Sequence, residues 1–220
     1  MSVEENIKRI RETIAETAEK SGRPPSSIRL MAVTKTVDDK RILEAIEAGV
    51  DLFGENYIQE AKRKIESMGK SVHWHMIGHV QTNKARIAAG LFEMIHSVDR
   101  IELAQELNKR VPASCLPLKI LIEVNIAGEE TKNGVPLAQA LTLVRDVSAL
   151  PNIAVQGLMT MPPYFDDPEE ARPYFRTLRE LKETIESEKI PRVEMKELSM
   201  GMTGDYAVAI EEGATIVRIG

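Results

Sequence analysis

The sequence contains a single cysteine, Cys115, among its 220 residues, so no disulfide can form within the chain. One unpaired cysteine suits a reducing compartment, where structural disulfides are rare. No apolar run approaches the roughly 20 residues that a membrane-spanning helix needs. The N-terminal MSVEENIKRI is charged and lacks the apolar core of a secretory signal. We therefore expect a soluble, cytoplasmic protein without a membrane partner.

An excess of basic residues is also lacking, since 29 lysines and arginines face 34 aspartates and glutamates. Proteins that bind nucleic acid nonspecifically need a positive surface to neutralise phosphates, so the net charge of -5 predicts no nucleic-acid partner. Low-complexity tracts and long polar linkers are absent. A chain of this length fits one domain, and we expect a single domain spanning residues 1–220.

Short apolar runs alternate with longer amphipathic stretches along most of the chain. Eight runs predict strands, at 28–33, 50–53, 73–77, 91–95, 118–124, 153–158, 195–198 and 214–219. Helical periodicity lies between them: residues 37–48 carry one apolar side and end before Gly49, and Pro136 and Pro168 can each start a helix. Apolar residues at 3, 7, 10 and 14 predict an additional N-terminal helix.

This alternation predicts an α/β fold, because parallel strands need crossover helices between them. About eight strand–helix units favour a single (β/α)8 TIM-type barrel, with an open doubly wound sheet as the alternative. The first strand is not followed by G-x-G-x-x-G, so the dinucleotide-binding form of the open sheet has no support.

Lys35 follows the first predicted strand, in the sequence Thr34-Lys35-Thr36. Functional groups of barrels sit at the carboxyl ends of the strands. An apolar wall there would lower the pKa of a lysine and free its amine to attack an aldehyde. Taken alone the signal is weak, since a lysine that ends a strand is more often a solvated surface residue.

A glycine-containing turn after the seventh strand, residues 199–205, predicts a phosphate site. Gly201 lets the backbone approach an anion, Ser199 and Thr203 add hydroxyls, and the amides that begin the next helix are free to bind phosphate oxygens. Barrel enzymes often bind phosphate after strands seven and eight. Asp205 argues against this site because it would repel the anion, and Thr203 could instead cap the helix.

Three other strand ends allow plain structural interpretations. Asn56 could bind a ligand oxygen, but it could equally cap the helix that follows the second strand. Asp99 reads as a helix cap. His73 and His75 lie two residues apart without a convincing third ligand, so core or rim histidines are favoured over a metal site. The strand-end lysine and the phosphate turn together predict a phosphorylated aldehyde at the barrel mouth.

Several motifs resemble one known family in the same order along nearly the whole chain. They are AVTKT at 32–36, GENYIQE at 54–60, WHMIG at 74–78, Asn125 with Glu130 and Lys132, GLMTM at 157–161 and LSMGM at 198–202. On these motifs the chain is similar to the pyridoxal phosphate homeostasis proteins, the YggS/PROSC family. The resemblance implies a barrel like the N-terminal domain of bacterial alanine racemase and a bound pyridoxal 5′-phosphate (PLP).

The resemblance also implies the roles of individual residues. It implies that Lys35 forms a Schiff base with PLP, that Arg218 meets the pyridine nitrogen and that Asn56 lines the pocket. The implied phosphate contacts are Ser199, Gly201, Thr203 and Gly220. Two departures stand out: Thr203 replaces the usual serine, and the family continues past the position of Gly220 with a segment containing Phe-Gly-x-Arg.

The resemblance favours a non-catalytic carrier or buffer that keeps free PLP low and supplies PLP-dependent apo-enzymes. The alternative is a PLP-dependent amino-acid racemase or another PLP enzyme of low activity. A racemase needs a second base opposite the lysine, and no tyrosine here has a clear claim to that position. A Schiff-base aldolase acting on a phosphorylated sugar would share the lysine and the phosphate turn.

Overall fold

The fold is described from a computed structural model that covers residues 2–69, 71–129 and 131–220. Glu130, one of the residues that carry the family resemblance, lies outside these ranges. The strands are β1 (Arg29–Val33), β2 (Leu52–Glu55), β3 (His73–Met76), β4 (Met94–Val98), β5 (Leu118–Asn125), β6 (Val135–Pro136), β7 (Ile153–Met159), β8 (Val193–Ser199) and β9 (Ile216–Ile219). The α-helices are α1 (Val3–Lys20), α2 (Asp39–Glu47), α3 (Ile58–Met68), α4 (Ala85–Leu91), α5 (Ile101–Arg110), α6 (Leu137–Ser148), α7 (Arg172–Ser187) and α8 (Tyr206–Glu211).

Four short 3₁₀ helices complete the elements of the described ranges. They are η1 (Pro25–Ser27), η2 (Thr82–Lys84), η3 (Ala113–Cys115) and η4 (Pro168–Ala171). None of the helices in the described part of the chain combines the length and apolar character needed to cross a bilayer.

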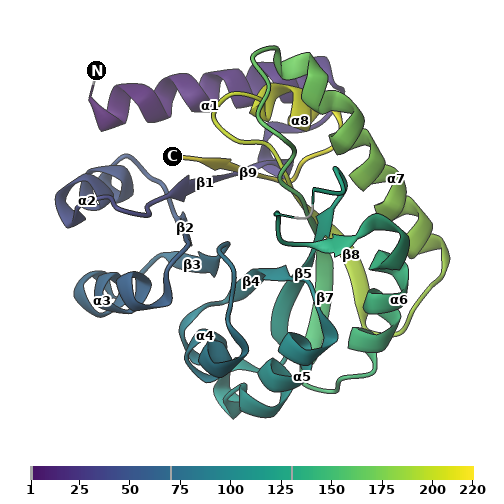
Figure 1. The fold of residues 1–220 in the computed structure, drawn as a ribbon. Helices are drawn as coiled ribbons and strands as arrows, with labels where there is room; N and C mark the ends of the chain where they lie inside the picture. Colours follow the sequence, from purple (N-terminus) through teal and green to yellow (C-terminus); the bar gives the residue numbers. More distant parts are fainter. Residues whose placement is uncertain (1, 70, 130) are drawn as a thin grey trace.

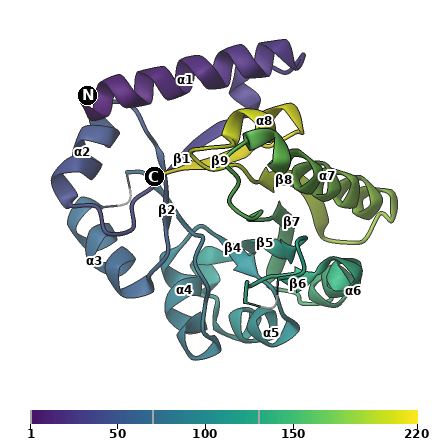
Figure 2. The ribbon, with the colours of Figure 1, turned by 45° about the horizontal axis from the view of Figure 1, so that its top comes forward.

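Eight parallel strands close into a barrel. The ring runs β1-β2-β3-β4-β5-β7-β8-β9 and closes where β9 pairs with β1, with Met31 opposite Arg218. The two-residue β6 pairs with the end of β5 outside this ring. Helices surround the strands (Figures 1 and 2). The predicted (β/α)8 barrel is therefore confirmed, and the open-sheet alternative is wrong.

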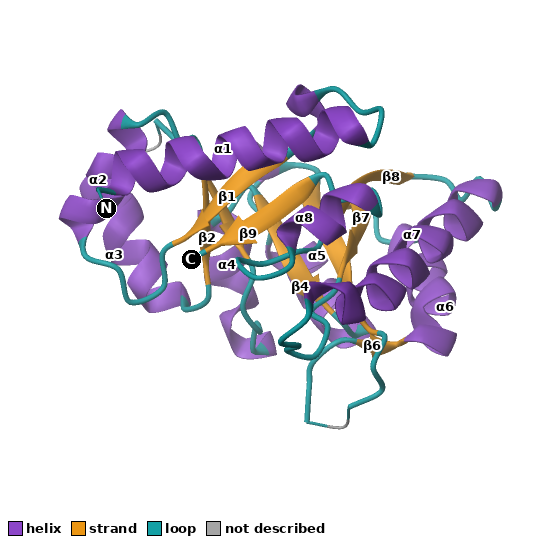
Figure 3. Ribbon diagram, turned by 90° about the horizontal axis from the view of Figure 1, so that it is seen from above, coloured by secondary structure: helices purple, strands orange, loops and turns teal. Residues whose placement is uncertain are grey.

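The additional N-terminal helix is also confirmed. Ser2 accepts a hydrogen bond from the Glu5 amide while the Glu5 carboxylate accepts one from Ser2, a reciprocal pair that caps the first turn of α1. Ile7 and Ile14 are buried on the inner side of the helix. Figures 2 and 3 show α1 lying along the β1–β9 side of the barrel, between α2 and α8.

The fourth strand begins later than the sequence predicts. The run 91–95 suggested a strand, but residues 85–91 form α4, which buries Ala85, Ala88 and Ala89, and β4 spans Met94–Val98. Leu91 therefore ends a helix instead of starting a strand. The shift places His96 and Ser97 within the strand, beyond the predicted end at residue 95.

Candidate functional site at the barrel mouth

The structure brings the predicted site residues to one end of the barrel. They lie within or directly after four strands that are neighbours in the ring, β2, β1, β9 and β8. The Gly220 amide lies 3.4 Å from Oγ1 of Thr203, and the Arg218 amide donates to the Gly201 carbonyl at 3.0 Å. A Cβ on Gly220 would lie 3.9 Å from Cβ of Val33, two residues before Lys35. The turn after β8 therefore meets the end of β1.

Lys35 lies at this end but is exposed to solvent. The expectation that an apolar wall desolvates its amine is wrong, because β1 ends at Val33 and the chain then turns outward. The residues on either side are held more firmly. Thr34 is buried, and Thr36 takes the left-handed backbone conformation with φ 61°. The result is a free amine on an anchored turn.

The turn after β8 suits an anion. Gly201 has φ 91°, and a Cβ there would lie 2.6 Å from Cβ of Ala209 and 3.0 Å from Cα of Tyr206, so only glycine lets the turn lie against α8. Thr203 and Gly204 are exposed, and within the described ranges their backbone amides donate to no protein acceptor. Free amides beside a hydroxyl are the donors that phosphate oxygens accept.

Asp205 does not oppose an anion in the way the sequence suggested. It is the N-cap of α8, and its Oδ1 accepts the Met202 amide at 2.6 Å, so the carboxylate is turned back into its own loop. Burial raises the pKa of Asp205, although the bond from Met202 and the charge of Arg218 act in the other direction. The interpretation of Thr203 as the helix cap is wrong, because Asp205 occupies that position.

A chain of buried polar side chains crosses the barrel interior beneath the mouth. Nη1 of Arg218 donates to Oγ of Ser199 at 2.8 Å, and that oxygen lies 2.9 Å from Nδ1 of His96. Nε2 of His96 lies 3.0 Å from Nδ1 of His75. Because the guanidinium can only donate, the Ser199 proton is free to point at His96. That assignment places the His96 proton on Nε2, where it donates to His75.

Burial keeps both histidines neutral. It lowers the pKa of His75 to about 3 and that of His96 well below its ordinary value. Neutral imidazoles each carry one donor and one acceptor, which the chain requires. Of the two histidines predicted to be core or rim residues, His75 lies in the core and is 3% exposed. His73 instead lies at the surface with Nδ1 2.7 Å from Oε2 of Glu93.

Arg218 is fixed from two sides. Besides Ser199 it donates through Nη2 to the Thr160 carbonyl at 2.9 Å, and it is 3% exposed. Burial lowers its pKa to about 10, while Glu123 and Asp205 raise it, so it stays charged at neutral pH. Burial and the charge of Asp99 raise the pKa of Glu123 to about 7, against the effect of Arg218. The barrel interior therefore holds the positive charge of Arg218, and the pKa of the buried Glu123 carboxyl lies near neutral pH.

Of the four residues expected to contact phosphate, Ser199 is the one whose side chain is turned away from the turn. Its side chain is fully buried and occupied by Arg218 and His96, so it faces the barrel interior and not the exposed turn. The turn itself is left to Gly201, Thr203 and their neighbours. Sequence reasoning missed His96 and Glu123. Both occupy inward positions of strands, and the alternation of side chains along a correctly placed β4 and β5 could have located them.

Asn56 presents an unused acceptor. The interpretation of Asn56 as a helix cap is wrong, because Tyr57 is the N-cap of α3 and no side chain caps that helix. Oδ1 of Asn56 is buried without a hydrogen-bond partner in the described part of the chain. Buried polar atoms without partners are rare, and they mark places where a ligand or water is bound. Asp99 does not cap its helix either; it pairs with Arg100 at 2.6 Å.

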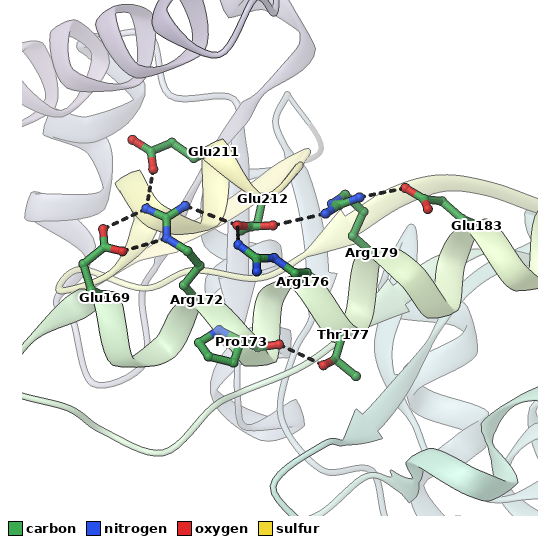
Figure 4. A network of polar contacts seen from close by, with 9 residues as sticks. All are labelled: Glu169, Arg172, Pro173, Arg176, Thr177, Arg179, Glu183, Glu211 and Glu212. Carbon is green, nitrogen blue, oxygen red and sulfur yellow. Dashed lines mark hydrogen bonds and ion pairs between the residues drawn. The ribbon is translucent and has the colours of Figure 1, made fainter.

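Helix α8, which follows the glycine-containing turn at 199–205, is bound to α7 by ion pairs. Glu212 accepts hydrogen bonds from three arginines on successive turns of α7, at 3.2 Å from Arg172, 3.0 Å from Arg176 and 3.3 Å from Arg179 (Figure 4). The Glu212 side chain is 7% exposed. Burial raises its pKa, but the three arginines outweigh that effect and the pKa lies below its ordinary value.

Comparison with known proteins places this site in a family. The family model described as alanine racemase, N-terminal domain, matches residues 3–220. A pyridoxal phosphate homeostasis protein of Aquifex aeolicus is 44% identical over 221 residues, covering 100% of this chain and 96% of the relative. That of Escherichia coli K12 is 38% identical, covering 98% and 92%. The chain belongs to the pyridoxal phosphate homeostasis protein family. The predicted family resemblance is thus confirmed.

Solved structures agree with this membership of the pyridoxal phosphate homeostasis proteins. PipY of Synechococcus elongatus, whose structure has PLP bound, is 33% identical with a TM-score of 0.80, covering 94% of this chain and 97% of PipY. Alanine racemase of Corynebacterium glutamicum is 17% identical with a TM-score of 0.70, covering 96% of this chain and 59% of the racemase. The second likeness shows the fold alone, and it confirms the predicted barrel type.

Proposed function

We propose that this chain binds PLP at the barrel mouth, holds it as a Schiff base on Lys35, and serves as a non-catalytic carrier and buffer of the cofactor. The observation that supports the proposal is that an exposed lysine lies beside a turn with available amides. Lys35 is exposed at the end of β1, and the turn beside that strand end holds the amides of Thr203 and Gly204, which donate to no acceptor in the part of the chain that the structure describes. An aldehyde and a phosphate on one small molecule fit both.

The covalent step needs only the lysine. The unprotonated Nζ of Lys35 adds to the aldehyde carbon, a carbon–nitrogen double bond forms, and the aldehyde oxygen leaves as water. The step is reversible by addition of water, which a carrier requires for release. Exposure of Lys35 gives water and incoming amines access to the bond, in contrast to the closed sites in which PLP enzymes exclude water.

The remaining predicted residues have distinct roles in this proposal. Thr203 and Gly220, together with the backbone at Gly201, would hold the phosphate, while the orphaned Oδ1 of Asn56 would accept a hydrogen bond from the ligand. Arg218 would donate to the pyridine nitrogen. Bound PLP supplies an electron sink to enzymes when that nitrogen is protonated. A charged arginine there would keep the nitrogen unprotonated and weaken that electron sink.

The first experiment is the visible absorption spectrum of the purified protein with PLP added. We expect wild type to develop a Schiff-base band that borohydride abolishes, and Lys35→Ala to lack it. Lys40→Ala, which removes an exposed lysine of the neighbouring α2, is the matched control and should keep the band. A wild type without the band, or a Lys35→Ala variant that retains it, would contradict the proposal.

Two further assays separate a carrier from an enzyme. The loaded protein should transfer PLP to a PLP-dependent apo-enzyme and restore its activity, and it should racemise no amino acid faster than free PLP does. Racemisation well above that background, lost in Lys35→Ala, would favour the enzyme alternative. A protein that takes up no PLP but cleaves phosphorylated sugars would favour the aldolase alternative.

A further inference from the structure

A buried lysine lies directly behind the turn that carries Lys35. The side chain of Lys64, on α3, is 0% exposed. Its Nζ donates three hydrogen bonds, to the Thr34 carbonyl at 2.5 Å, to Oε1 of Glu55 at 2.7 Å and to Oε1 of Glu60 at 2.7 Å. An ammonium has three protons to donate, so every donor is used. Lysine is rarely buried unless it is paired, and here two of the three partners are carboxylates.

The same two carboxylates hold the residues on both sides of Lys35. Oγ1 of Thr34 donates to Glu55 at 2.7 Å, and the Thr36 amide donates to Glu60 at 2.8 Å. Lys35 lies between these anchors and is itself exposed. The network therefore fixes the backbone before and after the lysine without touching its amine.

One of the anchored residues is strained. Thr36 has φ 61°, in the left-handed region that β-branched residues avoid. Such strain persists only where surrounding contacts enforce it, and it is concentrated at functional sites. The bond from the Thr36 amide to Glu60 is a contact that enforces it here. Burial raises the pKa of the Glu60 carboxyl, but hydrogen bonds from Lys64 and Thr36 outweigh burial and lower it.

We infer that Lys64, Glu55 and Glu60 are positioning residues that lock the Thr34–Thr36 turn in the conformation that presents Lys35 to an aldehyde ligand. The inference rests on the proposed function of Lys35 and adds residues that do not contact the ligand. A reactive group must be held close to its productive geometry by neighbours that are themselves fixed. Without Glu60, Thr36 would relax to negative φ and carry Lys35 with it.

Glu60 offers the sharpest test because it is partly exposed, at 23%, and can be removed without isolating a buried charge. In Glu60→Ala, Lys64 keeps Glu55 and the Thr34 carbonyl as partners, so we expect the variant to fold. In Glu60→Gln the amide oxygen can still accept from Thr36. Glu66→Ala, on the same helix, removes an exposed glutamate that pairs with Lys62 at 3.7 Å, and is the matched control.

The measurements are the rate of Schiff-base formation and the dissociation constant for PLP, both from the visible band, alongside urea unfolding of each protein. We expect Glu60→Ala to form the band roughly tenfold more slowly and to bind PLP roughly tenfold more weakly. Glu60→Gln and Glu66→Ala should both stay within about twofold of wild type.

A rescue variant tests the backbone argument directly. Asparagine adopts the left-handed conformation more readily than threonine. Thr36→Asn in the Glu60→Ala background should therefore restore most of the lost rate, because the turn no longer depends on Glu60. Equal rates in Glu60→Ala and wild type, or a double variant no better than Glu60→Ala, would overturn the inference. Either result leaves the proposed function standing as long as Lys35→Ala abolishes the band, so the two can fail separately.

Discussion

Nη1 of Arg218 donates to the hydroxyl of Ser199 at 2.8 Å inside the barrel, where both side chains are closed to solvent. The arginine that the family resemblance assigns to the pyridine nitrogen is therefore fixed in place by the protein itself. The serine that the resemblance assigns to the phosphate works as a support for that arginine. Through Ser199, the position of Arg218 depends on the neutral side chains of His96 and His75.

The first prediction concerns this support. Ser199→Ala should leave a guanidinium donor and the Nδ1 acceptor of His96 buried without partners, and we expect it to lower the free energy of unfolding by about 1–3 kcal/mol. Urea denaturation of the ligand-free protein measures the change. Ser26→Ala removes an exposed hydroxyl and is the matched control, expected within about 0.5 kcal/mol of wild type. An equal loss of unfolding free energy in Ser199→Ala and Ser26→Ala would contradict the hydrogen bonds of Ser199 to Arg218 and His96.

Sequence patterns predicted the barrel and the end at which the site lies, because apolar runs and strand–helix alternation are local properties of the chain. Lys35, Arg218 and the glycine turn after β8 were found because each follows or ends a strand. The partners of these residues were not found. Ser199 meets His96, which is 103 positions away in the chain, and this contact depends on which way each strand faces.

Local propensity also misplaced several caps. Asn56, Asp99 and Thr203 are all good helix-capping residue types, yet none caps a helix here. Tertiary contacts decide where each helix begins. Lys64 and Glu60 were overlooked because their i,i+4 spacing is typical of solvated helix surfaces, and the sequence does not reveal that this face packs against β2.

The second prediction separates a ligand contact from a structural role at Asn56. Its orphaned Oδ1 contributes little to stability, so we expect Asn56→Ala to change the free energy of unfolding of the ligand-free protein by less than about 1 kcal/mol. The same variant should bind PLP roughly tenfold more weakly, a difference of about 1.4 kcal/mol. Urea denaturation and titration of the visible band measure the two effects. A large stability loss with unchanged PLP affinity would exclude Asn56 from the pocket.

The third prediction concerns the clamp between α7 and α8. Glu212→Ala should lower the free energy of unfolding by about 1–3 kcal/mol, because it leaves three neighbouring arginines facing one another without their shared acceptor. Glu211→Ala is the matched control: its side chain is 42% exposed and, within the described residues, pairs with Arg172 alone, so we expect a change within about 0.5 kcal/mol. Thermal or urea unfolding distinguishes them. Similar losses of unfolding free energy in the two variants would mean that the three ion pairs of Glu212 do not stabilise the contact between α7 and α8.

The fourth prediction is a pH dependence at Glu123. Its pKa is about 7 in the folded protein, above the ordinary value of 4.5, because burial and Asp99 disfavour the carboxylate. As pH rises from 4.5, the unfolded chain releases this proton first, so the wild type loses stability until the folded carboxyl also ionises near pH 7. The pKa difference corresponds to about 3 kcal/mol.

Glu123→Gln removes that penalty because the amide stays neutral at every pH. We therefore expect the variant to gain stability relative to wild type by up to about 3 kcal/mol between pH 5 and pH 8.5, measured by urea denaturation at both values. Glu180→Gln, which removes one exposed negative charge, controls for net charge. The histidines do not disturb the comparison, since His75 and His96 are present in both proteins. If the free energy of unfolding of Glu123→Gln differs from that of wild type by the same amount at both pH values, burial does not raise the pKa of Glu123.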